Sequence, residues 1–210
     1  MSYIVSFLAF TLFSFTATAQ IVGVNSKPID ENRYEDIKGS PYLFDDWQEA
    51  TIYNKAGKSI EEAQVNYNIY EKEIEVKVAQ GYIELDGNAY PKILMLKDSS
   101  YFQYNAHPKF KGQFVLIHFK GEQHQLFSSS KSRINTRTIN NVGQNIELEN
   151  FANVHTYYLL KDDKLYSFKL KKKDVLDLFP DKSVNQFVKQ ERLKLSKVEE
   201  VVQLLRFVER

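Results

Sequence analysis

The sequence predicts an α+β domain, in which an antiparallel β-meander sheet or roll is followed by two to three C-terminal helices. Two observations lead to this class. Between residues 41 and 170, apolar and polar side chains alternate with a period of two, which is typical of half-buried strands. After Leu170, the apolar spacing changes to the three- and four-residue steps of helices. Strands that precede helices, rather than alternating with them, favour this class over a parallel βαβ fold.

The N-terminal segment predicts export. Residues 1–19 contain no Lys, Arg, Asp or Glu, have an apolar stretch at 4–15, and end in Ala17-Thr18-Ala19, an A-x-A cleavage site. We therefore expect a cleavable signal peptide, a mature chain that begins at Gln20, and a periplasmic, cell-surface or extracellular location. The apolar run is shorter than the ~20 residues of a transmembrane helix. The alternative to a signal peptide is a buried N-terminal helix. A polar lead-in over residues 20–40 follows.

Short turns separate the strands of the predicted sheet. Alternation is clearest over residues 65–70 and 73–78, with Glu71-Lys72 as the turn between them. The continuous apolar runs 93–96 and 114–119 suit strands covered on both faces. The remaining strands are expected at 50–54, 82–85, 101–104, 125–129, 134–139, 146–148, 154–160 and 166–170.

The last hairpin turns at Asp162-Asp163, and the side chains of Tyr166, Phe168 and Leu170 are expected to face the core. A helical tail starts at about residue 171.

Three helical segments follow that hairpin. The first, at 172–179, is ended by Pro180, and the second, around 184–188, has Asp181 as a possible N-cap. Ser196 and Glu199 have the spacing of a capping box. They precede a helix whose apolar stripe we expect to dock on the domain's own sheet: Val198, Val201, Val202, Leu205 and Val208.

Composition limits the classes of function. Residues 41–210 have the length of a single domain. The net charge is +1, which gives no overall attraction to nucleic acid, and nucleic acid is not an expected partner. The absence of cysteine excludes disulfides, thiol chemistry and Cys-bound zinc. No segment after the signal peptide has the length and hydropathy to span a bilayer.

Segments near both ends of the mature chain resemble a family of uncharacterised exported proteins of Bacteroidota. The matching residues are GSPYL at 39–43, VNYNIY at 65–70, EIE at 73–75 and KKKDVLDLFPDK at 171–182. The middle of the chain, from 97 to 153, resembles the family poorly. The resemblance implies export and the fold class, and it implies no catalytic residues because the family carries no assigned activity.

One aromatic cluster is a candidate binding site. Tyr42, Phe44 and Trp47 lie close together near the start of the domain. Tyr and Trp are favoured at protein interfaces and sugar-binding platforms, because they bury a large area and keep a polar tip. The alternative is that these side chains begin the hydrophobic core.

Histidines and carboxylates offer weaker candidates. His118 and His124 could share a metal across a hairpin, but no third ligand is evident and we expect no metal. Glu71, Glu73 and Glu75 share one face of a strand. Paired carboxylates perform glycosidase chemistry, but we expect these three on a solvated sheet face.

A cationic stretch lies in the middle of the chain. Lys131, Arg133 and Arg137 stand among Ser, Thr and Asn residues. They could contact phosphate or an acidic glycan, but a strand with an outward charged face explains them as well.

No motif of catalysis or of cofactor binding is present: the sequence has no G-x-S-x-G, H-E-x-x-H, P-loop or G-x-G-x-x-G. We therefore expect no cofactor, and the sequence identifies no catalytic residue. The favoured function is a non-enzymatic exported envelope protein with a binding or structural role, whose partner is another envelope protein or a glycan. The alternative is a secreted or periplasmic hydrolase with a scattered carboxylate/His acid-base site, since catalytic residues need not be close in sequence.

Overall fold

The computed structural model describes residues 27–79, 81–141 and 144–210. Its strands are β1 (Ile37–Lys38), β2 (Gln48–Tyr53), β3 (Ser59–Asn68), β4 (Glu73–Val78), β5 (Gly81–Glu84), β6 (Lys92–Met95), β7 (Tyr101–Tyr104), β8 (Phe114–Lys120), β9 (His124–Asn141), β10 (Gln144–Lys161) and β11 (Lys164–Phe168). A 3₁₀ turn, Pro108–Phe110, precedes β8, and the helices are α1 (Lys172–Leu176), α2 (Lys182–Gln190) and α3 (Val198–Val208). A β-rich sheet followed by three short helices confirms the predicted class.

The sheet is not the simple antiparallel meander that we predicted. Its strand order is β1-β10-β9-β8-β7-β6-β2-β3-β4-β5, with β11 also paired to β10. Strand β2 lies between β3 and β6, so the chain crosses over after β5. Strand β1 runs parallel to β10. The alternation of side chains specifies the faces of a strand but not its neighbours, and for this reason the order and the parallel pair were missed.

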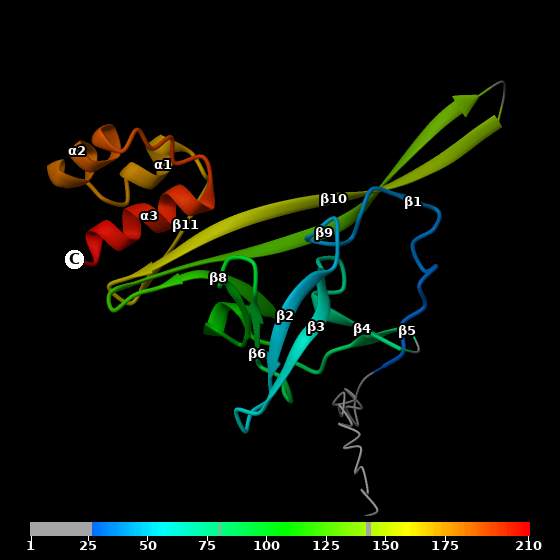
Figure 1. Ribbon diagram of the computed structural model, residues 1–210. Helices are drawn as coiled ribbons and strands as arrows, with labels where there is room; N and C mark the ends of the chain where they lie inside the picture. Colours follow the sequence, from blue (N-terminus) through cyan, green and yellow to red (C-terminus); the bar gives the residue numbers. More distant parts are fainter. Residues whose placement is uncertain (1–26, 80, 142–143) are drawn as a thin grey trace, which may run out of the picture.

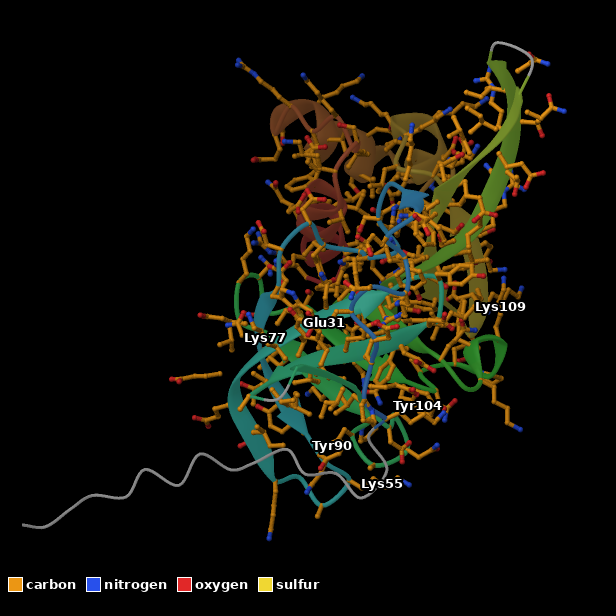
Figure 2. The ribbon with its side chains drawn as sticks, turned by 90° about the vertical axis from the view of Figure 1, so that its right-hand side faces the viewer. Glu31, Lys55, Lys77, Tyr90, Tyr104 and Lys109 are labelled. Atoms are coloured by element: carbon orange, nitrogen blue, oxygen red, sulfur yellow. The ribbon has the colours of Figure 1, made fainter. Side chains whose placement is uncertain are left out.

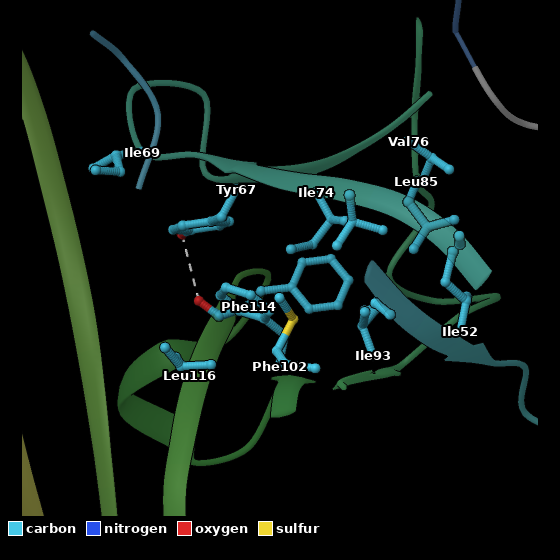
Figure 3. Packing of buried hydrophobic residues seen from close by; sticks show 14 residues of the cluster. Ile52, Tyr67, Ile69, Ile74, Val76, Leu85, Ile93, Phe102, Phe114 and Leu116 are labelled. Atoms are coloured by element: carbon cyan, nitrogen blue, oxygen red, sulfur yellow. Dashed lines mark hydrogen bonds between the residues drawn. The ribbon is translucent and has the colours of Figure 1, made fainter. Parts of the chain in front are cut away.

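The first core fills the inner face of the sheet from β2 to β8 (Figure 3). Tyr67 extends into it and donates a hydrogen bond of 3.4 Å to the carbonyl of Phe114. The apolar run of β8 is buried on both faces, as predicted: Phe114 and Leu116 belong to this core, whereas Val115 and Ile117 pack with Phe110 and Phe127 on the other face.

The helices cover a second core at the far end of the sheet (Figure 1). Leu126 and Leu159 of the sheet pack with Val201, Leu204 and Leu205 of α3. The expected docking of the helical stripe on the chain's own sheet is therefore confirmed. Three of these side chains, Leu126, Leu204 and Leu205, have no exposed surface.

Local signals at the helix ends were partly correct. Asp181 caps α2 by accepting a 2.7 Å hydrogen bond from the backbone N–H of Ser183, as predicted. The capping box that we assigned to Ser196 and Glu199 was wrong by one residue. The carboxylate of Glu200 accepts hydrogen bonds from the N–H groups of Ser196 and Lys197, because α3 begins at Val198 and Glu200 occupies its third position.

Tyr166 does not face the core. It is 38% exposed, whereas Phe168 is buried and Leu170 is half-buried beside the helices. The turn before β11 was predicted correctly, and Asp162 and Asp163 both adopt the positive φ angles of a tight hairpin turn.

Strands β9 and β10 form a long two-stranded arm. Each has 18 residues, and they pair continuously from His124–Lys161 to Asn141–Gln144. Strand β8 pairs with β9 only as far as Ser128, and β1 pairs with β10 at Glu149 and Asn150. The part of the arm beyond these residues extends past the rest of the molecule (Figures 1 and 2). Phe151 anchors the base of this outer part through edge-on contacts with Tyr34 and Tyr70, at ring-centroid distances of 5.3 and 5.6 Å.

The lead-in contributes to the fold in its described part. The N–H of Ile29 donates to the carbonyl of Tyr82 and the N–H of Glu84 donates to the carbonyl of Lys27, so this segment lies along the edge of β5. The predicted signal peptide lies outside the described residues. Within the part of the chain that the structure describes, none of the helices is long and apolar enough to cross a bilayer.

Candidate functional site

The three aromatic residues singled out in the sequence lie in one loop that leads into β2. Backbone hydrogen bonds from Leu43 to the carbonyl of Tyr67 and from Ile69 to the carbonyl of Pro41 hold the loop against the end of β3. The side-chain amide of Asn66 accepts from the N–H of Phe44 at 3.3 Å and donates to its carbonyl at 2.9 Å. The loop is therefore fixed by the strand beside it.

The structure separates Phe44 from the other two residues. Phe44 packs against the first core, with its ring edge-on to Phe102 at 6.3 Å. Trp47 stacks in parallel on Tyr82 of β5 at 4.8 Å, and Tyr42 lies 6.4 Å from the indole. Phe44 is thus a core residue, whereas Tyr42 and Trp47 belong to an aromatic group with Tyr82 on the outer face of the sheet.

An open groove borders Trp47. It has a volume of about 410 Å³ and is lined by Trp47, Gln48, Glu49, Gln64, Leu96 and Lys97. Glu49 and Gln64 lie directly opposite each other on β2 and β3. The turn after β6 forms the other wall, where the N–H of Leu96 donates to the carbonyl of Glu49 at 3.1 Å. Apolar walls around a polar floor suit a ligand that has both hydroxyl groups and apolar faces.

A buried carboxylate lies on the same outer face of the sheet. Glu75 is only 2% exposed and pairs with Arg33, which is 42 residues away in the chain. Its oxygens also accept hydrogen bonds of 2.9 Å from the hydroxyl of Tyr42 and 2.7 Å from the amide of Asn68. Burial and the negative charge of Glu75 raise the pKa of Tyr42, so the phenol remains a proton donor.

Our expectation of a solvated face was therefore wrong for Glu73 and Glu75, whereas Glu71 is exposed. Glu75 is covered by the lead-in, which the alternation of β4 alone does not reveal. Burial and a hydrogen bond with Glu84 raise the pKa of Glu73 to about 7, assisted by the charges of Glu84 and Glu71. Glu73 thus keeps its proton up to near-neutral pH, on the same face as the paired Glu75.

The histidines have separate partners and do not form a common site. His118 Nε2 lies 2.8 Å from Ser128 Oγ, and His155 Nδ1 lies 2.8 Å from Ser130 Oγ. His124 Nδ1 lies 2.8 Å from a carboxylate oxygen of Glu209. Among the described residues, no group of three His, Cys, Asp or Glu side chains could hold a metal ion.

Burial makes His118 a neutral imidazole. It lowers the pKa of His118 to about 4, although the charges of Asp98 and Glu199 act in the opposite direction. A neutral ring next to a serine hydroxyl is the arrangement of a nucleophile and its base. However, Ser128 is only 9% exposed, and no carboxylate in the described part of the chain is hydrogen-bonded to this ring.

Glu209 closes the hairpin between β8 and β9. Its carboxylate accepts hydrogen bonds from the N–H groups of Glu122, Gln123 and His124, in addition to the imidazole of His124. Burial opposes ionisation, but these donors outweigh it and hold the pKa of Glu209 below its usual range. A Cβ atom at Gly121 would lie 2.5–2.7 Å from this carboxylate, so a larger residue there would have to displace the carboxylate from its donors.

Comparisons with models of protein families, with curated proteins and with solved structures found no match to this chain.

Proposed function

We propose that this protein is a non-enzymatic binding protein of the cell envelope that holds a glycan in the groove beside Trp47. The observation that carries this proposal is the groove itself. Its indole wall is fixed from behind by Tyr82, and its floor carries the paired side chains of Glu49 and Gln64.

Sugar rings offer apolar C–H faces and many hydroxyl groups. An indole supplies a flat apolar surface for the first. Amide, carboxylate and ammonium groups hydrogen-bond to the second, and the groove contains all three in Gln64, Glu49 and Lys97. The volume of about 410 Å³ is within the range of small-ligand sites. Export, predicted from residues 1–19, would place the groove where envelope polysaccharides are found.

The chain contains a single tryptophan, so its fluorescence reports directly on the groove. Mature protein would be titrated with soluble peptidoglycan fragments and with oligosaccharides released from envelope polysaccharide. We expect a saturable change in Trp47 emission. The affinity should be about 10-fold weaker in Gln64→Ala, because a ligand hydroxyl group loses its hydrogen-bond partner. Tyr166→Ala is the matched control, because this exposed side chain lies on β11, away from the groove. The proposal would be contradicted if none of these sugars changed the emission, or if Gln64→Ala bound them with the same affinity as the unmodified protein.

A second candidate is a hydrolase, favoured by the 2.8 Å contact between His118 Nε2 and Ser128 Oγ. The hydrolase is the less favoured candidate, because Ser128 is buried and a substrate has little access to its hydroxyl group. A fluorophosphonate probe that labels activated serines tests it. Labelling of the native protein that disappears in Ser128→Ala would establish the hydrolase and displace the first proposal.

A further inference from the structure

The outer part of the β9–β10 arm has two chemically different faces. Because side chains alternate, residues that are opposite each other across the two strands share a face. One face, here called the basic–aliphatic face, consists of Lys131, Arg133, Asn135, Arg137 and Ile139 on β9, with Ile146, Leu148, Asn150, Ala152 and Val154 opposite them on β10. The other face carries Glu147 and Glu149 opposite Thr138 and Thr136.

Charge is completely separated between the two faces. The basic–aliphatic face has three cations and no carboxylate, although the whole chain has a net charge of only +1. None of the three cations forms an ion pair with any residue that the structure describes. A strand whose charges only kept it soluble would not need to place all its cations on one face.

The aliphatic side chains on this face have no covering element. Val154 is 60% exposed and Ile146 is 37% exposed. None of the buried clusters in the described parts of the chain includes Ile139, Ile146 or Leu148. Ile139 and Ile146 are directly opposite each other near the end of the arm, and Arg137 with Leu148 is the next pair inward on this face.

We infer that the arm docks on the surface of an anionic phospholipid bilayer through its basic–aliphatic face. The Ile139–Ile146 pair would enter the boundary of the acyl chains, and the guanidinium groups of Arg137 and Arg133 would lie among the phosphates. Apolar insertion combined with electrostatic attraction is the physical basis of interfacial binding by amphipathic segments. Long cationic side chains keep their heads in the polar layer while their stems cover apolar surface.

The aliphatic residues favour a lipid over the other anionic partners. A soluble polyanion would use the cations and leave the isoleucines in water. A second copy of this chain offers two carboxylates on the opposite face of its arm. They lie opposite threonines, and the apolar Phe151 of that face is already buried against Tyr34 and Tyr70. The projection of the arm beyond the body leaves its outer part accessible to a flat surface (Figure 2).

Vesicle co-sedimentation of the mature protein tests this inference. We expect binding to phosphatidylcholine vesicles that contain phosphatidylglycerol, little binding to pure phosphatidylcholine, and release as salt is raised. Each Lys or Arg near an anionic leaflet strengthens binding about fivefold, so R133E/R137E should weaken binding by at least about 10-fold. Ile146→Ser with Leu148→Ser should also weaken it, at unchanged charge.

The matched control is K172E/K173E, which changes the net charge by the same amount at two exposed lysines of α1. It should retain binding, and melting curves of all variants should overlay. Equal loss in this control would mean that overall charge alone drives adsorption. Binding to dextran sulfate but not to vesicles would assign the face to a soluble polyanion, and a dimer that R133E/R137E dissociates would assign it to self-association. Each of these results overturns the inference, and none depends on the Trp47 groove.

Discussion

Truncation of Leu205 tests whether α3 is part of the folded core. Leu205 has no exposed surface and packs in the second core with Leu126 and Leu159 of the sheet. Leu205→Ala removes three carbon atoms from this core. At about 0.8 kcal/mol for each buried methylene, the lost transfer free energy alone is about 2.4 kcal/mol.

The cavity adds to this loss. Leucine-to-alanine changes in well-packed cores cost about 2.7–5.0 kcal/mol, with the larger values at sites that cannot collapse. Here the neighbours come from both the sheet and the helices, which restricts their movement. We therefore expect Leu205→Ala to lower the free energy of unfolding by about 3–5 kcal/mol. In a domain of this size, that corresponds to a fall in Tm of about 6–20 °C.

Urea denaturation of the mature protein, followed by circular dichroism, measures this loss. Arg206→Ala is the control, because Arg206 is the exposed neighbour on the same helix, and it should change stability by less than about 0.5 kcal/mol. If Leu205→Ala cost as little as Arg206→Ala, the helix would not be core, and its apolar stripe would have to be a surface for a partner.

Four further predictions follow from the residues described above. In the folded state the pKa of Glu73 is about 7, whereas in the unfolded chain it has its ordinary value of about 4.5. The folded state therefore binds the extra proton between these values, and stability should fall as pH rises from about 4.5 to 7. Glu73→Gln should reduce this fall and stabilise the protein above pH 7, as measured by Tm against pH. Gly121→Ala should displace the carboxylate of Glu209 and lower Tm, whereas the same change at Gly112, where a Cβ meets no atom within 4 Å, should cause only the strain of its positive φ. N-terminal mass spectrometry of exported material should find Gln20 as the first residue, and an intact N-terminus would refute the signal peptide. Elemental analysis should find no stoichiometric metal, and about one zinc per chain that is lost in His118→Ala would overturn this expectation.

The sequence by itself determined most of the local structure. Alternation located most of the strands, but it divided β9 and β10 into two shorter strands each and missed β1. Turn residues located the hairpins at Glu71-Lys72 and Asp162-Asp163, and the change of period located the helices. These features depend on a few neighbouring residues, so local chemistry decides them. The docking of α3 also followed from sequence, because a wide apolar stripe must be buried somewhere and the nearest surface is the adjoining hairpin.

Only the tertiary structure decided which elements are neighbours. It placed β2 between β3 and β6, joined Arg33 to Glu75, and brought Glu209 to a hairpin 85 residues away. It also separated Phe44 from Trp47 and put a groove beside the latter. The alternation in a strand indicates which face is buried, but it is compatible with many neighbouring strands. The packing of the whole sheet therefore decides which strands pair. For the same reason, the basic–aliphatic face could not be recognised from β9 alone, since half of its residues come from β10 and only the register of the pair brings them together.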